Sequence, residues 1–67
     1  MEITRHAYDQ AIARGIDGDL LRGALLKGKV ERYGKHGIKF VSKGRKRTIT
    51  CVGEIRGDTI VIFTAEA

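Results

Sequence analysis

The sequence contains no proline and no tryptophan, and it has only one cysteine, Cys51. With a single thiol, no disulfide can form within the chain. The apolar runs are far shorter than the roughly 20 residues that a helix needs to cross a bilayer. The sequence also shows no low-complexity stretch, no internal repeat and no signal-peptide pattern. These absences argue against a disulfide scaffold and against a membrane partner, and we expect a cytoplasmic protein.

Aromatic residues are scarce as well. The only rings are those of Tyr8, Tyr33, Phe40 and Phe63. The core should need several of them, which leaves few for stacking on the bases of a single-stranded nucleic acid. A site that works by base stacking is therefore disfavoured.

The chain is short, and 67 residues leave room for one domain only, over residues 1–67. A chain of this size buries only about 60% of the surface that it exposes when unfolded, so we expect marginal stability. A partner that covers apolar surface, or the contact between two copies in a homodimer, would therefore help.

What the sequence has in excess is positive charge. Its 13 Lys and Arg residues oppose 8 Asp and Glu residues, which gives a net charge of +5 at pH 7. A field of this sign favours polyanions or an acidic protein over neutral partners. The alternative is a solvated basic surface without a specific partner.

The first half of the chain predicts two helices joined by a short loop. Thr4 can cap a helix over about residues 5–14, whose apolar residues recur at helical spacing. Asp17 can cap a second helix, over about residues 17–27. A glycine follows each helix, as is common at helix C-termini. The short loop between the helices predicts an αα-hairpin.

From Lys29 onward the pattern changes to short strands rich in β-branched residues, with turns between them. Successive strands joined by tight turns lie antiparallel. The expected fold is therefore α+β, with the αα-hairpin packed on one face of a four-stranded antiparallel sheet. We expect these strands over about residues 29–33, 38–42, 46–55 and 59–64.

Two further expectations concern the sheet itself. Gly53 is a candidate for a β-bulge within the long third strand, and Gly57-Asp58 is a hairpin turn signal. The face away from the helices should carry much of the basic charge. The face that packs on the helices should carry Ile38, Phe40, Ile49, Cys51, Ile60 and Ile62.

Three polar residues line one edge of the first helix. His6, Gln10 and Arg14 are spaced four apart, so they stand in a column beside the apolar stripe. His6 lies in the first turn, where the helix dipole disfavours the imidazolium, and a neutral histidine can act as a general base. The alternative is a surface or capping histidine.

A cluster of cations marks the turn before the third predicted strand. It consists of Lys43, Arg45, Lys46 and Arg47. Such a cluster can bind phosphate oxygens and offset the charge that develops on a phosphorane. Because side chains alternate along a strand, Arg45 and Arg47 should point to one side and Lys46 to the other. The alternative is a charged hairpin that discourages edge pairing.

Other patterns carry no function. The segment from Gly23 to Lys29 has the spacing of a P-loop, but Val30 replaces the residue that would hold magnesium, and the segment follows a helix. His6, His36 and Cys51 are too few and too scattered for a zinc site, and we expect no metal and no other cofactor. Cys51 has apolar neighbours in mid-strand, which is typical of an inert core residue.

Two short motifs resemble those of a known family. The segment from Thr4 to Ala7, followed by the segment from Arg14 to Asp17, is similar to the signature of the domain of unknown function 4258. The segment from Asp58 to Thr64 is similar to that family's last strand, so the resemblance spans nearly the whole chain. The family is similar in turn to the RelE/barnase-like ribonucleases of toxin–antitoxin systems. This likeness implies RNA cleavage without a metal and an acidic antitoxin as partner.

Carried over by position, the resemblance implies that His6 is the acid or base and that Arg14 binds or positions phosphate. Thr64 would be a polar group at the end of the last strand. Family members often have an arginine three residues after Ala7, where this chain has Gln10. Loss of that cation would weaken phosphate binding, or the chain would bind RNA without cutting it.

The leading hypothesis is a metal-independent endoribonuclease, acting as the toxin of a toxin–antitoxin pair, on ribosome-associated or free RNA. The 2′-hydroxyl would attack the adjacent phosphorus with His6 as base, while arginines stabilise the developing charge. The catalytic residues would be His6, Arg14, Arg45, Arg47 and Thr64, and the RNA-binding residues would be Gln10, Lys43 and Lys46. The second hypothesis is a non-catalytic basic module that binds RNA, DNA or an acidic protein. The third is a small structural or assembly protein whose charge keeps it in solution.

Overall fold

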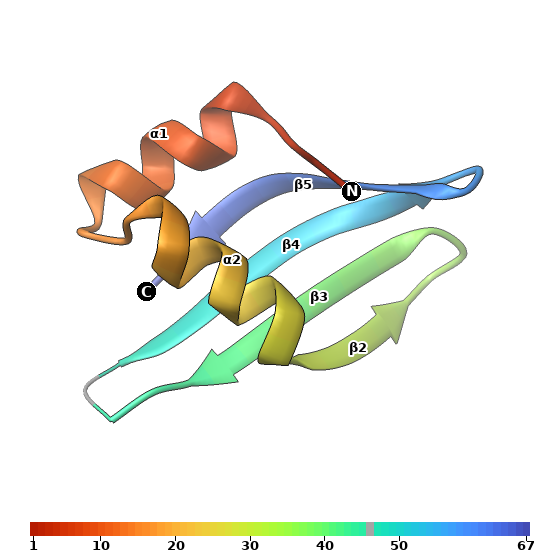
Figure 1. Ribbon diagram of the computed structural model, residues 1–67. Coiled ribbons are helices and arrows are strands. Elements are labelled where there is room, and N and C mark those ends of the chain that lie inside the picture. The colour runs from red at the N-terminus through yellow and green to blue at the C-terminus, as the bar shows by residue number, and fades with distance from the viewer. Residues whose placement is uncertain (46) are drawn as a thin grey trace.

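The computed structural model describes residues 1–45 and 47–67, and over these residues the fold is α+β, with two helices and a five-stranded sheet (Figure 1). The helices are α1 (Arg5–Ala13) and α2 (Gly18–Lys27). The strands are β1 (Glu2–Ile3), β2 (Lys29–Tyr33), β3 (Gly37–Lys43), β4 (Thr48–Arg56) and β5 (Thr59–Glu66). Their order across the sheet is β1-β5-β4-β3-β2.

Both helices begin where the sequence predicts a cap. The Thr4 hydroxyl accepts a hydrogen bond from the Ala7 N–H at 3.1 Å, and the Asp17 carboxylate accepts one from the Leu20 N–H at 2.8 Å. Each side chain satisfies a backbone donor that has no partner within the helix. After α1 the chain turns at Gly15, whose φ of 74° is unfavourable for residues with a side chain.

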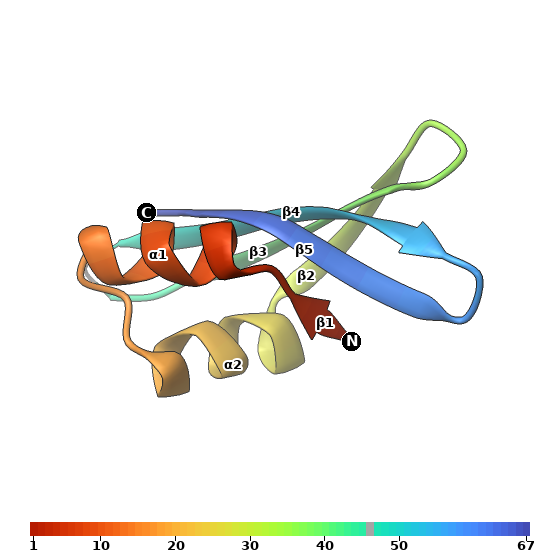
Figure 2. The ribbon, with the colours of Figure 1, turned by 90° about the horizontal axis from the view of Figure 1, so that it is seen from above.

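The two helices cover one face of the sheet (Figure 2). α1 packs mainly on β5, and α2 packs on β3 and β4. Of the six residues predicted for the core face of the sheet, five are buried and Ile60 is half-buried against the core, so this prediction is confirmed. The core lies between the two layers, and its most completely buried large side chains are Ile16, Leu21, Cys51 and Ile62.

The sheet differs from the predicted four-stranded, wholly antiparallel sheet because it has a fifth strand, β1. This strand pairs parallel to β5, with Glu2 opposite Val61 and Ile3 opposite Ile62, so the sheet is mixed. A strand of two residues is too short to show an alternating pattern, and its partner is at the other end of the chain. The αα-hairpin is also only partly right, because the helices pack mainly on strands and not on each other.

The remaining strand predictions differ from the structure only at the ends. β3 and β4 form an antiparallel hairpin that joins Lys43 to Thr48. Lys46, where the third predicted strand begins, lies outside the described residues. The sheet has an irregularity at the position of Gly53, as predicted, but the extra residue lies in β5: Gly53 pairs with Ile62 and Val52 with Thr64, which leaves Phe63 unpaired. A Cβ on Gly53 would overlap the Val61 carbonyl oxygen. Neither α1 nor α2 has the length and the apolar character that a membrane crossing requires.

Candidate functional site

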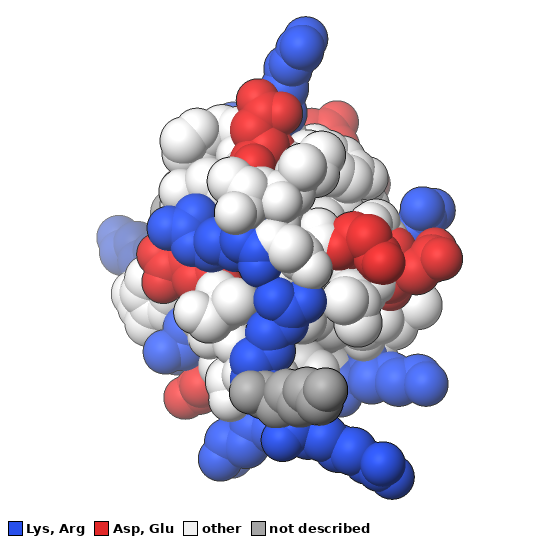
Figure 3. Space-filling model, turned by 90° about the vertical axis from the view of Figure 1, so that its left-hand side faces the viewer, with Lys and Arg blue, Asp and Glu red and all other residues white. Residues whose placement is uncertain are grey.

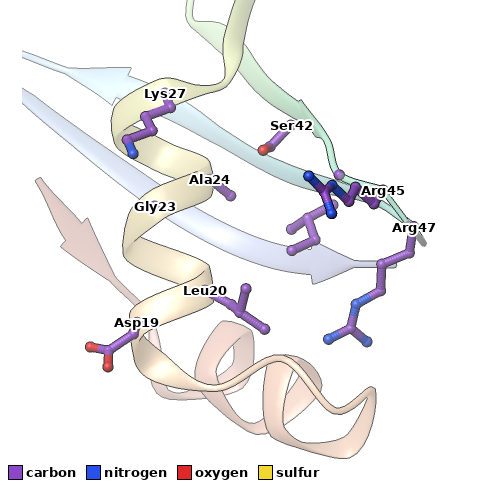
Figure 4. Close-up of a pocket in the computed structure, with 10 residues that line it drawn as sticks. Asp19, Leu20, Gly23, Ala24, Lys27, Ser42, Arg45 and Arg47 are labelled. Carbon is purple, nitrogen blue, oxygen red and sulfur yellow. The ribbon is translucent and has the colours of Figure 1, made fainter.

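A groove of about 420 Å³ separates α2 from the β3–β4 hairpin. Leu20 and Ala24 point into it from the helix, while Arg45 and Arg47 lie on the hairpin side (Figure 4). Leu20 is 45% exposed, so the apolar floor of the groove is open to solvent. The groove therefore combines apolar surface with cationic groups, and its full lining is Asp19, Leu20, Gly23, Ala24, Lys27, Ser42, Gly44, Arg45, Arg47 and Ile49.

Positive charge gathers at this end of the molecule. Lys and Arg side chains run down the middle of the side shown in Figure 3, and acidic side chains lie to either side of them. Arg45 is exposed, and Lys27 adds a cation from the last turn of α2. Arg45 and Arg47 both line the groove, although they lie in the connection between β3 and β4 and not in a strand.

Arg47 also has a structural task. Its Nη1 donates a hydrogen bond to the Arg14 carbonyl oxygen at 2.9 Å, and its Nη2 donates one to the Gly15 carbonyl oxygen at 2.7 Å. Carbonyl groups at the end of a helix lack partners within the helix and carry a partial negative charge. The guanidinium therefore caps α1 from outside and ties the hairpin to it.

Gln10 likewise contacts the protein itself. Its Oε1 accepts a hydrogen bond from the Ala65 N–H at 3.2 Å. β1 ends at Ile3, whereas β5 continues to Glu66, so the last part of β5 extends beyond its parallel neighbour. The glutamine amide thus satisfies a backbone donor on the edge of β5.

His6 lies at the other end of α1 from the cationic groove. It is exposed in the first turn, and between His6 and Arg14 the helix rises about 12 Å at about 1.5 Å per residue. The Arg47 guanidinium is bound at the Arg14 end. The imidazole and the hairpin guanidinium groups therefore do not meet at one hollow.

The remaining predicted residues lie elsewhere. Thr64 is half-buried opposite Val52, and because its neighbour Ala65 is buried beneath α1, Thr64 faces the uncovered side of the sheet. Lys43 lines a second hollow, of about 370 Å³, together with Lys29, Glu31 and Val41. Lys46 lies outside the described residues.

The sequence reasoning missed two groove residues on α2. Leu20 lies at the margin of the apolar face with which α2 packs on the sheet, and its side chain faces the groove. Lys27 was not singled out. Its position in the last turn of the helix, beside the predicted start of the sheet, was the available signal.

Cys51 is a core residue, as predicted. It is fully buried, and burial raises the pKa of its thiol from 9.0 to about 11 because the thiolate would be poorly solvated there. Such a thiol is a weak nucleophile near neutral pH. Among the described residues, no group of three or more His, Cys, Asp or Glu side chains is placed to hold a metal ion.

Comparison with known proteins identifies the family. No curated protein and no solved structure matches the chain. One family model, described as a domain of unknown function (DUF4258), matches residues 3–66. This match covers nearly all of the chain and confirms the family predicted from the two sequence motifs. The chain is therefore a member of the DUF4258 family.

Proposed function

We propose that this chain is a non-catalytic binding module that takes an acidic segment of a partner protein into the groove between α2 and the β3–β4 hairpin. The observation that carries the proposal is the composition of the groove, with apolar side chains from α2 facing arginines from the hairpin. A partner segment would place apolar side chains on the floor and carboxylates against the cations.

The apolar floor favours a protein segment over RNA. Leu20 is 45% exposed and offers contact to aliphatic or aromatic side chains of a partner, whereas Ala24 and Ile49 belong to the buried core behind the groove lining. None of the described residues that line the groove is aromatic, so they offer bases no stacking platform. RNA would be held by its phosphates alone, whereas an acidic amphipathic segment matches both parts of the lining.

The cationic residues that line the groove, Lys27, Arg45 and Arg47, would recognise carboxylates. Arg45 can form paired hydrogen bonds with a carboxylate, which gives both energy and orientation. Two Arg47 donors bind the end of α1. Arg47 therefore holds the hairpin side of the groove in place, and its positive charge still attracts a carboxylate. Lys27 adds a point charge from the opposite side.

The test is a binding titration with defined probes. A fluorescent peptide that alternates Leu and Glu is compared with a peptide that alternates Leu and Gln, and with a uridine oligonucleotide. We expect the Glu peptide to bind most tightly, and Arg45→Glu to weaken it about tenfold or more, equivalent to about 1.4 kcal/mol. Lys35→Glu makes the same charge change in the β2–β3 turn and serves as control, with an expected loss below about threefold. Equal losses in the two variants, or tighter binding of the oligonucleotide, would contradict the proposal.

Ribonuclease activity of the toxin type remains a second proposal. It is supported by the exposure of His6, which leaves the imidazole accessible to RNA, and by the basic hairpin end. The separation of these groups along α1 is the reason for ranking it second. Antitoxin binding and a cytoplasmic location belong to this proposal.

The ribonuclease proposal has its own assay, in which the protein and its His6→Ala variant are incubated with RNA in EDTA. Cleavage that falls about 10²–10⁴-fold in the variant would support it. Equal cleavage by both proteins, or by neither, would remove His6 from the mechanism.

A further inference from the structure

We infer that β2 is a self-association edge, which pairs antiparallel with β2 of a second copy and joins the two sheets into one. This surface lies apart from the groove and does not depend on the proposed function. Within residues 1–45 and 47–67, β3 is the strand partner of β2, and no segment lies beyond its outer edge (Figure 1). All residues of β2 are exposed. An unpaired edge of this kind is a template for another strand.

The charges along β2 select one register. If a two-fold axis passes through Val30, Lys29 of each copy lies opposite Glu31 of the other. Opposite charges at paired positions stabilise a sheet, and like charges destabilise it. An axis through Glu31 would set two carboxylates against each other, and an axis through Arg32 would set two guanidinium groups against each other. Of the axes through the three central residues of β2, only the one through Val30 sets opposite charges against each other.

The two faces of the joined sheet support the same register. Glu31 lies opposite Lys39 of β3, with the Lys39 Nζ 4.0 Å from the Glu31 Oε2. Pairing about Val30 would place Glu31 between this ammonium group and Lys29 of the second copy. Val30 is opposite the buried Phe40, so it lies on the helix-covered side, and it is 50% exposed. At the axis the two Val30 side chains would cover one another.

The cations of the β3–β4 hairpin lie far from this interface. The β3–β4 hairpin, which carries Arg45 and Arg47, turns at one end of β3, and the β2–β3 turn lies at the other end. Antiparallel pairing of the two β2 strands therefore directs the two hairpins toward opposite ends of the joined sheet. Exposed charges separated by more than about 8 Å are largely screened at physiological salt. Since β2 is short, the interface is smaller than that of a stable dimer, and we expect weak association, roughly micromolar or weaker.

The register can be tested by cross-linking. Under mild oxidation, Val30→Cys should give a covalent dimer, because residues at a two-fold axis meet their own copies. Arg32→Cys, on the same strand and face, is the matched control and should give at least about fivefold less dimer. The native Cys51 is fully buried and does not compete. Equal cross-linking by the two variants, or none by either, would overturn the inference.

A charge-swap experiment tests the same contact without a covalent bond. Lys29→Glu and Glu31→Lys should each weaken self-association about tenfold or more, as measured by sedimentation, because like charges then face each other. An equimolar mixture of the two variants should recover association, since each contact again joins opposite charges. Lys35→Glu is the control and should associate like the unmodified chain. A chain that stays monomeric at millimolar concentration, or a mixture that shows no recovery, would overturn the inference.

Discussion

The two edges of the sheet are treated in opposite ways by the rest of the chain. At the β5 side, β1 pairs with the strand, the Thr4 N–H donates to the Ile62 carbonyl oxygen at 3.0 Å, and Gln10 binds the Ala65 N–H. At the β2 side, no comparable contact covers the strand within the described part of the chain. One edge is built into the folding unit, and the other is left available for association.

The contrast in burial follows from this difference. Every residue of β5 except the last is buried or half-buried, whereas every residue of β2 is exposed. α1 can approach β5 closely because the residues that it turns toward the core, Ala7 and Ala11, are small and fully buried. We therefore expect substitutions at the covered β5 edge to change the free energy of unfolding. Substitutions at the exposed β2 edge should change self-association instead.

The largest expected effect is at Ile62, which is fully buried between β1 and β4. Ile62→Ala should lower the free energy of unfolding by about 2–5 kcal/mol, because it leaves a cavity in the core. Urea denaturation followed by circular dichroism measures this change. In dilute, monomeric protein, Val30→Ala on the bare edge should cost only about 0.5 kcal/mol. Similar costs at the two positions would remove the contrast between the edges.

A second prediction concerns the pH dependence of stability at Cys51, which pairs with Ala65 just inside the covered edge. The folded pKa of about 11 exceeds the ordinary value of 9.0, so the unfolded chain loses the thiol proton first as the pH rises. The contribution of this group is fully present below pH 9.0 and is lost as the pH rises toward 11. The loss is about 1.4 kcal/mol per pH unit, or about 3 kcal/mol in all.

The control for this prediction is Cys51→Ala, measured over the same pH range. Tyrosine and lysine residues also titrate there, so the difference between the two stability curves is the quantity of interest. Parallel curves for the two proteins would show that burial does not disfavour the thiolate.

Among the changes at the covered edge, the smallest effect is expected at Gln10. Gln10→Leu should lower the free energy of unfolding by about 1 kcal/mol, because the Ala65 N–H loses its acceptor. Hydrogen exchange at that amide should accelerate accordingly. Gln10→Glu keeps an acceptor oxygen and should cost less. If the two variants exchanged at the same rate as the unmodified chain, the hydrogen bond would not protect this edge.

Local features of the fold were predictable from the sequence. Thr4 and Asp17 each bond a backbone N–H three residues ahead, and such short-range bonds depend on the local sequence. Alternation along the strands was enough to place Phe40 and Cys51 in the core. β1 was missed because its pairing with β5 is long-range and its length is too short for a pattern.

The candidate site was less predictable than the fold. His6, Gln10 and Arg14 do follow one edge of α1 and its C-cap, as their spacing predicts. Helical spacing does not show, however, which strand lies beside that edge. In the folded chain, Gln10 meets the end of β5 and Arg47 meets the end of α1. Gln10 and Arg47, which were predicted to contact RNA, thus bind the backbone of distant segments of the chain. The groove is lined by Leu20 and Arg45, which are far apart in the sequence.

Taken alone, the sequence determined the family, the two helices with their caps, the order of the antiparallel hairpins and the composition of the core. These features depend on residues a few positions apart, where hydrogen-bonding reach and side-chain periodicity leave few options. Only the tertiary structure decided the parallel β1 strand, the cationic groove and the bare β2 edge. Each of these depends on which distant segments come together when apolar surface is buried, and that choice is made by the packing of the whole chain.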